Sequence, residues 1–227
     1  MPMSAKAAGV LAGFILVACT GEFPTDVQEV RAAEDTFDRE LLITSLNEIE
    51  AWHIRNDTGV EKNLAAGRNT ASILADFDGI DCKPTEELRT LWSWRDGGIG
   101  AVPFIWYHDF LPSREALAEY KRLQRIPLLR WDPRYIPIFS FEGEWYAAYC
   151  GEGADNAGPV AHFFLEDEAR ITHTNLTMFL ASMAEAFDTG AIRWENEGMA
   201  EDLRQVYRIH QKHNPGYSFP YYVPEEN

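Results

Sequence analysis

Apolar residues recur at helical spacing in several stretches after residue 40. The first includes Leu42, Leu46 and Ile49, which share one helix face because they are three or four residues apart. Turn-forming residues at 56–59 end this predicted helix. Further helices are predicted around Ala71–Phe77, from Pro84 with Glu86 and Glu87 in its first turn, from a Ser113 cap, from a Thr174 cap to Gly190, and from Met199 to His210.

Between these helices, shorter stretches have the composition and alternation of strands. They are Ala101–Tyr107, Tyr135–Phe141, Trp145–Cys150 and Pro159–Leu165. Short turns between the last three favour antiparallel hairpins. The order of helices, then strands, then helices predicts an α+β fold with a mainly antiparallel sheet flanked by N- and C-terminal helices.

The predicted domain covers residues 41–213, and a tail follows at 214–227. The tail contains three prolines and four aromatic residues. So many exposed aromatic side chains would be unusual. We therefore expect the tail to pack back onto the domain as an extended strap.

The N-terminal segment combines one positive charge, Lys6, with an apolar run from Ala7 to Ala18. This run has the length of a signal-peptide core and is shorter than a membrane span. Leu16-Val17-Ala18-Cys19 resembles the bacterial lipobox, in which the cysteine is fatty-acylated and becomes the new N-terminus. A plain secretory signal with an incidental Cys19 is the alternative.

The lipobox interpretation divides the chain into a signal peptide at 1–18 and an acidic tether at 19–40. It implies a palmitate-type anchor in the cell envelope, because two or three acyl chains hold a protein firmly on a bilayer. Thr20 after the cysteine is typical of lipoproteins sent to the outer membrane, facing the periplasm, if the host is Gram-negative.

The formal charge of −16 makes nucleic acid an improbable partner, because phosphate binding requires clustered Lys and Arg. The charge becomes −17 when Lys6 leaves with the signal peptide. A basic protein would be attracted to such a surface, although the charge is equally consistent with simple solubility. With Cys19 acylated, Cys82 and Cys150 remain, either as a disulfide formed outside the cytoplasm or as two buried thiols.

Several sequence positions, taken in their order along the chain, resemble the SUKH superfamily, the Smi/Knr group. The positions that correspond to its structural motif are Asp96, Gly97, Gly98, Trp131, Pro137, Gly143 and Gly158. They are accompanied by Lys83–Leu88, Trp92, Phe110-Leu111, Ser113, Leu117, Tyr120, Ile136, Ile138, Glu144, Pro159-Val160 and Asn175–Leu180. The resemblance spans about residues 41–190.

The resemblance implies an α+β binding module without a catalytic centre or cofactor. The superfamily includes a fungal regulator of cell-wall assembly and bacterial immunity proteins that neutralise toxins. Together with Cys19, it suggests an immunity-type protein against a toxin that acts in the envelope. The alternatives are a scaffold for envelope assembly and, with less support, an envelope hydrolase.

For the shared positions, a structural role is expected. Gly97 and Gly98 allow a turn from helix to strand. Pro137 is predicted at a strand start or edge, where its missing N–H does no harm. Trp92 and Trp131 are predicted core residues.

The sequence offers little support for catalysis. Acidic pairs such as Asp167/Glu168 and Glu195/Glu197 are expected by chance in so acidic a chain. The glycines at 151, 153 and 158 lie between predicted strands, where a phosphate loop would not form. No Gly-x-Ser-x-Gly motif is present.

Metal binding is also not indicated by motif. His210 and His213 are three residues apart and would face the same side of the last helix. No third ligand is identifiable near them, and no His-Glu-x-x-His motif occurs. The remaining histidines are His53, His108, His162 and His173, and all six are expected to be exposed or ordinary surface residues.

A partner surface is predicted at the strand ends, where acidic and aromatic residues could form one patch that meets basic residues. The alternative is a solvated acidic rim. The predicted patch consists of Glu142, Glu144, Trp145, Glu152, Asp155, Glu166, Asp167 and Glu168.

Overall fold

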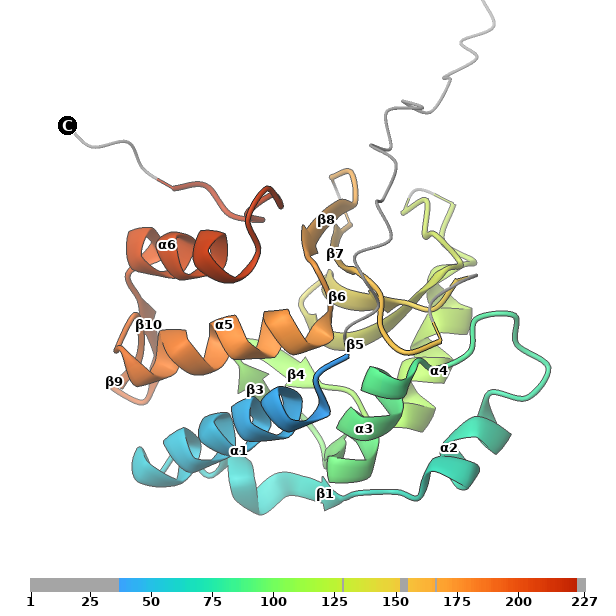
Figure 1. Cartoon of the computed structure of the whole chain (residues 1–227), viewed down its shortest axis with the longest axis horizontal. Helices are drawn as coiled ribbons and strands as arrows, with labels where there is room; N and C mark the ends of the chain where they lie inside the picture. The colour runs from blue at the N-terminus through green and yellow to red at the C-terminus, as the bar shows by residue number, and fades with distance from the viewer. Residues whose placement is uncertain (1–36, 128, 152–154, 166, 224–227) are drawn as a thin grey trace, which may run out of the picture. The chain divides into compact units, whose positions relative to one another are not determined.

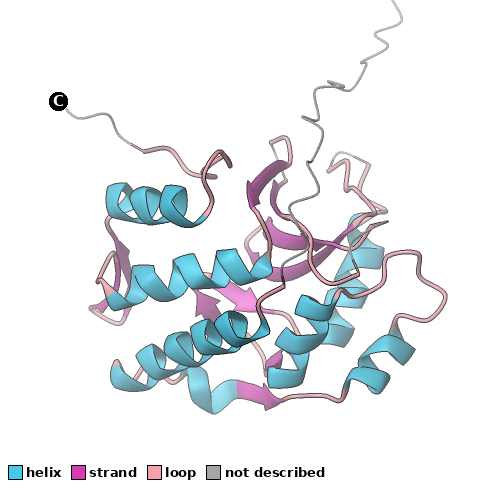
Figure 2. Cartoon of the chain, viewed as in Figure 1, coloured by secondary structure: helices cyan, strands magenta, loops and turns pink. Residues whose placement is uncertain are grey.

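A six-stranded antiparallel sheet organises the fold, with the strand order β3-β4-β5-β6-β7-β8 (Figures 1 and 2). The computed structural model describes residues 37–127, 129–151, 155–165 and 167–223. The sheet consists of β3 (Pro103–Ile105), β4 (His108–Phe110), β5 (Tyr135–Phe141), β6 (Glu144–Tyr149), β7 (Val160–Phe164) and β8 (Arg170–His173). The predicted α+β class with mainly antiparallel strands is confirmed.

The helices are α1 (Arg39–Arg55), α2 (Thr70–Asp76), α3 (Glu86–Trp94), α4 (Ser113–Leu123), α5 (Leu176–Asp188) and α6 (Leu203–His213), with a 3₁₀ helix η1 at Val60–Asn63. Two small antiparallel pairs join β1 (Leu64–Ala66) to β2 (Arg95–Gly98) and β9 (Ile192–Glu195) to β10 (Gly198–Glu201). Helices α6, α5 and α1 lie side by side in that order (Figure 1).

Each face of the sheet is buried against a different group of residues. On β6, Tyr146 and Ala148 face the larger core, which includes Phe179 of α5 and the apolar side of α1. Trp145 and Ala147 point to the opposite face and join a smaller cluster with Leu123 of α4 and Trp131. Strand alternation explains this division, because successive side chains point to opposite faces. Trp92 and Trp131 are both buried, as predicted.

Some element boundaries differ from the prediction because residues other than glycine adopt positive φ in two hairpin turns. The stretch Ala101–Tyr107 is not one strand. It ends in a hairpin between β3 and β4, with Trp106 at a φ of 53°. The first residues of the predicted last helix, from Met199, belong to β10, which forms a hairpin with β9 through Asn196 and Glu197 at positive φ. These turns do not use glycine, the residue that most readily adopts positive φ.

Three predicted local roles were wrong at least in part. The segment Asp96–Gly98 is not a turn from helix to strand but part of β2, which pairs with β1, although Gly97 has the expected positive φ. Ser113 is the first residue of α4 and does not cap it. Instead, its backbone N–H donates to the Asp96 carboxylate over 2.9 Å. Asn175, not Thr174, caps α5 by accepting the N–H of Met178.

Pro137 lies in the interior strand β5, and not at a strand start or sheet edge as predicted. Two features accommodate its missing N–H. Strand β4 pairs with β5 only at Phe139 and Ser140, so Pro137 lies beyond the paired part of β4. The register with β6 also shifts between Pro137 and Phe139. Proline is tolerated in sheets at such irregularities.

The β5–β6 turn and the C-terminal tail agree with the sequence. Glu142 and Gly143 form the turn with φ values of 40° and 94°, a conformation that favours glycine. The described part of the tail packs on the larger core through Phe219 and Tyr221. Helix α1 begins at Arg39, two residues before the predicted start of the domain at residue 41.

The buried carboxylate of Glu87 on α3 holds the start of α5. One oxygen accepts the Thr177 N–H over 2.9 Å and the Thr177 hydroxyl, and the other accepts the Leu176 N–H over 3.2 Å. These donors are among the first N–H groups of α5, which have no partner inside the helix. Burial outweighs these hydrogen bonds and raises the pKa of Glu87 to about 7.

This pKa predicts a specific pH dependence. Because Glu87 binds a proton more tightly in the folded than in the unfolded chain, its contribution to stability falls as pH rises from about 4.5 to 7. Relative to a Glu87→Gln variant, the wild type should lose about 3 kcal/mol of unfolding free energy across this range. Urea unfolding of both proteins at closely spaced pH values measures the difference. Parallel pH profiles would contradict this prediction.

Candidate functional site

The predicted acidic patch is only partly present. Glu142 is exposed in the β5–β6 turn, and Asp167 and Glu168 are exposed in the β7–β8 turn. The two turns are adjacent, because the Leu165 N–H donates to the Gly143 carbonyl over 3.0 Å. Leu165, 44% exposed, lies beside them. This smaller surface, formed by Glu142, Leu165, Asp167 and Glu168, is named the turn surface below.

The other predicted patch residues do not belong to this surface. Trp145 is buried against Trp131, because its position on β6 points toward the smaller core. Asp155 lies in the loop at the opposite end of β6 and β7, where its carbonyl accepts the Glu86 N–H. Predictions on Cys19, Glu152 and Glu166 fall outside the described residues.

Glu144, the remaining patch residue, points inward instead of toward solvent. Its Oε2 lies 3.2 Å from Nε2 of His162 on β7 and 3.6 Å from Nε2 of His108 on β4. The donor atoms of the three residues all lie within 4.8 Å of one another. We refer to His108, Glu144 and His162 as the His–Glu cluster.

His108 is the most deeply buried member of the cluster, with a side chain 2% exposed. Its ring packs against Phe141 and Tyr146 at centroid distances of 5.9 and 4.9 Å. Neither ring nitrogen has a hydrogen-bond partner among the described residues. Leaving buried polar atoms without partners costs about 1–3 kcal/mol each.

Two tyrosine hydroxyls close the cluster toward the C-terminal strap. Tyr221 donates to Glu144 Oε2 over 3.4 Å, and its oxygen lies 3.1 Å from that of Tyr146. The Tyr221 ring also packs edge-on against Trp106, at a centroid distance of 4.8 Å. The strap therefore covers one side of the cluster and reaches the β3–β4 hairpin.

The electrostatics of the cluster favour an ionised carboxylate beside a neutral imidazole. His108 and His162 hold the pKa of Glu144 at about 2, against the opposing effect of burial. Burial lowers the pKa of His108 more than the neighbouring Glu144 raises it. Burial also raises the pKa values of Tyr146 and Tyr221, so both hydroxyls stay protonated at neutral pH.

The sequence motifs did not reveal this cluster, because its residues come from three different strands, β4, β6 and β7, and form no local motif. Register brings them together: Tyr146 pairs with His162, and Glu144 lies two residues before Tyr146 on the same face. The available signal was a histidine or glutamate at a core-facing strand position. A correct strand register would have been needed to use that signal.

The expectation of surface histidines was wrong for His53, His173 and His210, which are buried, and His210 and His213 do not form a site together. His210 is buried and its Nε2 lies 2.7 Å from the Thr172 carbonyl oxygen, whereas His213 lies 2.6 Å from Glu185. His173 packs edge-on against His210, at a centroid distance of 4.8 Å. His53 lies between Thr58 and the Phe104 carbonyl, within hydrogen-bond distance of both.

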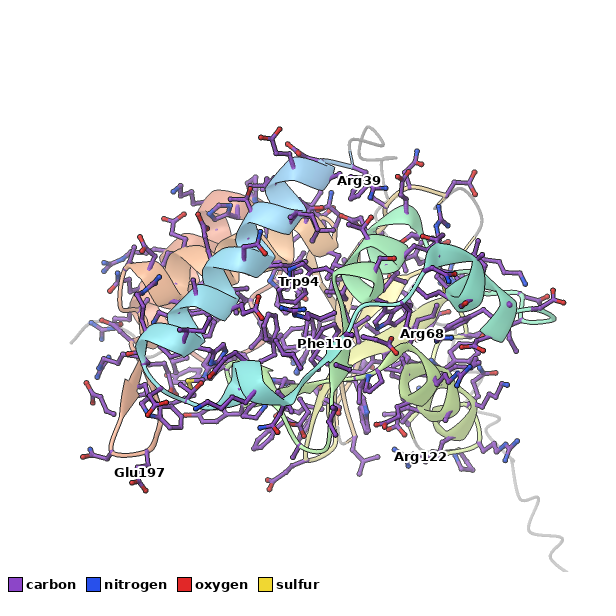
Figure 3. All side chains as sticks on the ribbon, turned by 90° about the horizontal axis from the view of Figure 1, so that it is seen from below. Arg39, Arg68, Trp94, Phe110, Arg122 and Glu197 are labelled. Carbon is purple, nitrogen blue, oxygen red and sulfur yellow. A yellow bond between two sulfur atoms is a disulfide. The ribbon has the colours of Figure 1, made fainter. Side chains whose placement is uncertain are left out.

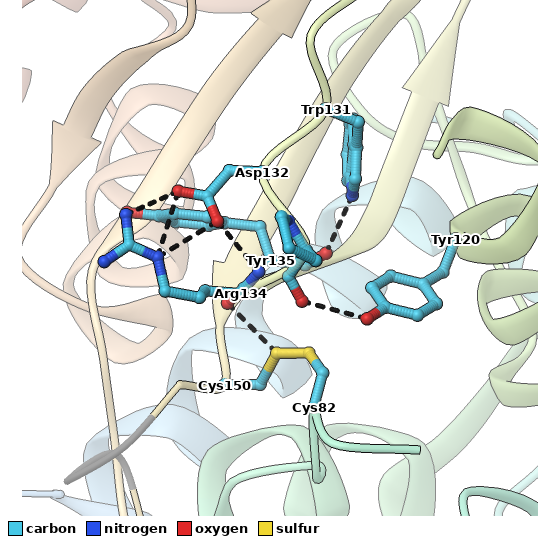
Figure 4. Close-up of a disulfide and its surroundings, with 8 residues drawn as sticks. Cys82, Tyr120, Trp131, Asp132, Arg134, Tyr135 and Cys150 are labelled. Atoms are coloured by element: carbon cyan, nitrogen blue, oxygen red, sulfur yellow. Dashed lines mark hydrogen bonds and ion pairs between the residues drawn. A yellow bond between two sulfur atoms is a disulfide. The ribbon is translucent and has the colours of Figure 1, made fainter. Parts of the chain in front are cut away.

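The structure joins Cys82 to Cys150 in a disulfide, one of the two alternatives open from the sequence (Figure 4). The bond connects the loop before α3 to the end of β6, with a Cα–Cα distance of 5.1 Å. The Cys150 N–H donates to the Arg134 carbonyl over 2.8 Å. Nearby, the Tyr120 hydroxyl and the Trp131 indole bond to the carbonyls of Pro133 and Tyr135, which hold this segment in place.

Comparison with models of known protein families and with characterised proteins finds no match to this chain. Within the residues that the structure describes, no helix is long and apolar enough to span a membrane.

Proposed function

We propose that this chain is a lipid-anchored, SUKH-like protein-binding domain that neutralises a toxin acting in the cell envelope. The proposal depends mainly on one observation: residues of the SUKH-like motif make contacts and turns that hold the α+β fold together. Asp96 caps α4 from β2, Gly97 lies against Pro112, and Gly143 makes the β5–β6 turn. Such roles are typical of a scaffold whose function lies in exposed loops.

The disulfide supports the exported location. Disulfides persist in oxidising compartments and are rare in the cytoplasm. A chain with the Cys82–Cys150 bond is therefore suited to the periplasm or cell surface, where a lipid on Cys19 would hold it. In a Gram-negative host, the proposed place is the outer membrane facing the periplasm.

The turn surface is the proposed contact with the partner. It combines acidic side chains at Glu142 and Glu168 with the exposed apolar side chain of Leu165. A basic toxin surface would be attracted by the charge and could bury Leu165 at the centre of the contact. The domain acts by covering the toxin and performs no chemistry on it.

Expression of the chain should protect cells against a toxin encoded by a neighbouring gene. Cys19→Ser should reduce protection against toxin supplied from outside, because the unacylated domain is no longer held at the membrane. Survival counts and membrane fractionation measure the two effects. Unchanged protection by the Cys19→Ser variant would remove the anchor from the mechanism, and a wall defect on deletion without any protection would favour the assembly scaffold.

The same experiment tests the turn surface. Glu142→Lys combined with Glu168→Lys should weaken toxin binding about tenfold, mainly through a slower association rate. Glu197→Lys is the matched control, because Glu197 is also an exposed glutamate at positive φ and lies at the tip of the β9–β10 hairpin (Figure 3). Equal affinities of the two variants would place the contact elsewhere.

A further inference from the structure

The His–Glu cluster has the donor atoms and spacing of a metal site. Zinc binds imidazole nitrogen and carboxylate oxygen at about 2.0–2.1 Å, so two ligand atoms of a tetrahedral site lie about 3.3 Å apart. The observed separations from Glu144 Oε2 are 3.2 Å to His162 and 3.6 Å to His108. All three ligand atoms lie within 4.8 Å of one another, so an ion between them would require the side chains to draw together.

The unpartnered imidazole of His108 points independently to a ligand. Its Nε2 is buried, lacks a hydrogen bond among the described residues and lies on the side of Glu144. At 3.6 Å, the separation from the carboxylate is too long for a hydrogen bond. A metal ion would give this nitrogen a closer partner than the Glu144 carboxylate at 3.6 Å.

We propose that His108, Glu144 and His162 bind one transition-metal dication, with zinc as the best match. Two imidazoles and one carboxylate favour zinc, nickel or copper over magnesium and calcium, which prefer oxygen ligands. The ion's charge is partly balanced by Glu144. This site is independent of the proposed toxin binding.

Metal binding at the His–Glu cluster would also hold the C-terminal strap in place. The Tyr221 hydroxyl reaches the same Glu144 oxygen that faces both histidines. A metal that fixes Glu144 therefore also fixes the acceptor of the Tyr221 hydrogen bond, in the way that groups around a metal orient its ligands. Zinc should consequently protect the tail from proteolysis.

The test is calorimetric titration of ZnCl₂ into the full chain carrying Cys19→Ser, which removes the free thiol as a competing ligand. The protein is first freed of metal with a chelator. We expect one zinc per chain with a dissociation constant of about 1 μM or below, a higher melting temperature, slower cleavage of the tail and no such effects from MgCl₂.

Three variants locate the ion. His162→Gln and the charge-conserving Glu144→Asp should both weaken zinc binding, with His162→Gln weakening it at least about 100-fold. His213→Gln is the matched control, because His213 also lies beside a glutamate but in a separate place. Circular dichroism without zinc establishes that each variant is folded.

The proposal is overturned if the wild type binds no zinc, or if His162→Gln binds it as tightly as the wild type. Loss of binding in His213→Gln alone would place the ion beside Glu185 and would equally overturn it. If His162→Gln does not fold, the outcome for Glu144→Asp decides, because that variant keeps the charge that faces both histidines.

Discussion

Removing the Cys82–Cys150 disulfide is expected to lower the free energy of unfolding by about 4 kcal/mol. The bond joins residues 68 positions apart, so it restricts a long loop in the unfolded chain. The entropy of the unfolded state rises when that restriction is lost. Urea unfolding of the Cys82→Ala/Cys150→Ala variant against the oxidised wild type measures the effect.

The double variant also supplies its own control. Its unfolding midpoint should not respond to a thiol reductant, whereas the wild type, refolded under reducing conditions, should approach the midpoint of the variant. Equal stability of the oxidised wild type and the double variant would show that the bond does not constrain the fold. A strongly destabilised reduced form would fit the proposed oxidising location.

Gly97→Ala is expected to destabilise the fold by about 4 kcal/mol. Gly97 has a φ of 74°, which strains any residue with a Cβ atom. The added Cβ would also lie 2.2 Å from the Pro112 nitrogen and 2.6 Å from the Leu111 carbonyl carbon. Backbone atoms cannot move aside as a flexible side chain can, so β2 and the start of α4 would separate.

Gly100→Ala separates the two causes. Gly100 has a similar φ of 82°, but a Cβ there would meet no atom within 4 Å. This control should therefore cost only the backbone strain, about 1 kcal/mol. Thermal unfolding of both variants measures the difference, and equal losses would mean that the close approach to Pro112 has no energetic role.

The contact between Gly97 of β2 and Pro112 before α4, called the Gly97 junction below, was only partly predictable from the sequence. Two consecutive glycines predicted a positive φ, which other residues rarely adopt, and Gly97 has this conformation. The reason for glycine at this position is contact with a segment fifteen residues later, together with the Asp96 cap on α4. Arg68, which lies close to this junction (Figure 3), bonds Ser113 and Asp76 and ties α2 to it.

The predicted acidic patch was also only partly predictable from the sequence. The exposure of Glu142, Asp167 and Glu168 was predictable, because acidic residues in short turns between strands remain solvated. The inward orientation of Glu144 was not, because β6 begins at Glu144, one residue before the predicted strand, and the alternation of β6 then places Glu144 on the face of Tyr146.

By itself, the sequence determined the α+β class, the helix and strand content of its strongly periodic stretches and the burial of Trp92 and Trp131. These features depend on local periodicity, which a single chain segment contains. Only the tertiary structure decided the pairing of Cys82 with Cys150, the packing of Gly97 on Pro112 and the meeting of His108, Glu144 and His162. Each of these depends on strand register and on distances between remote segments, which no local pattern records.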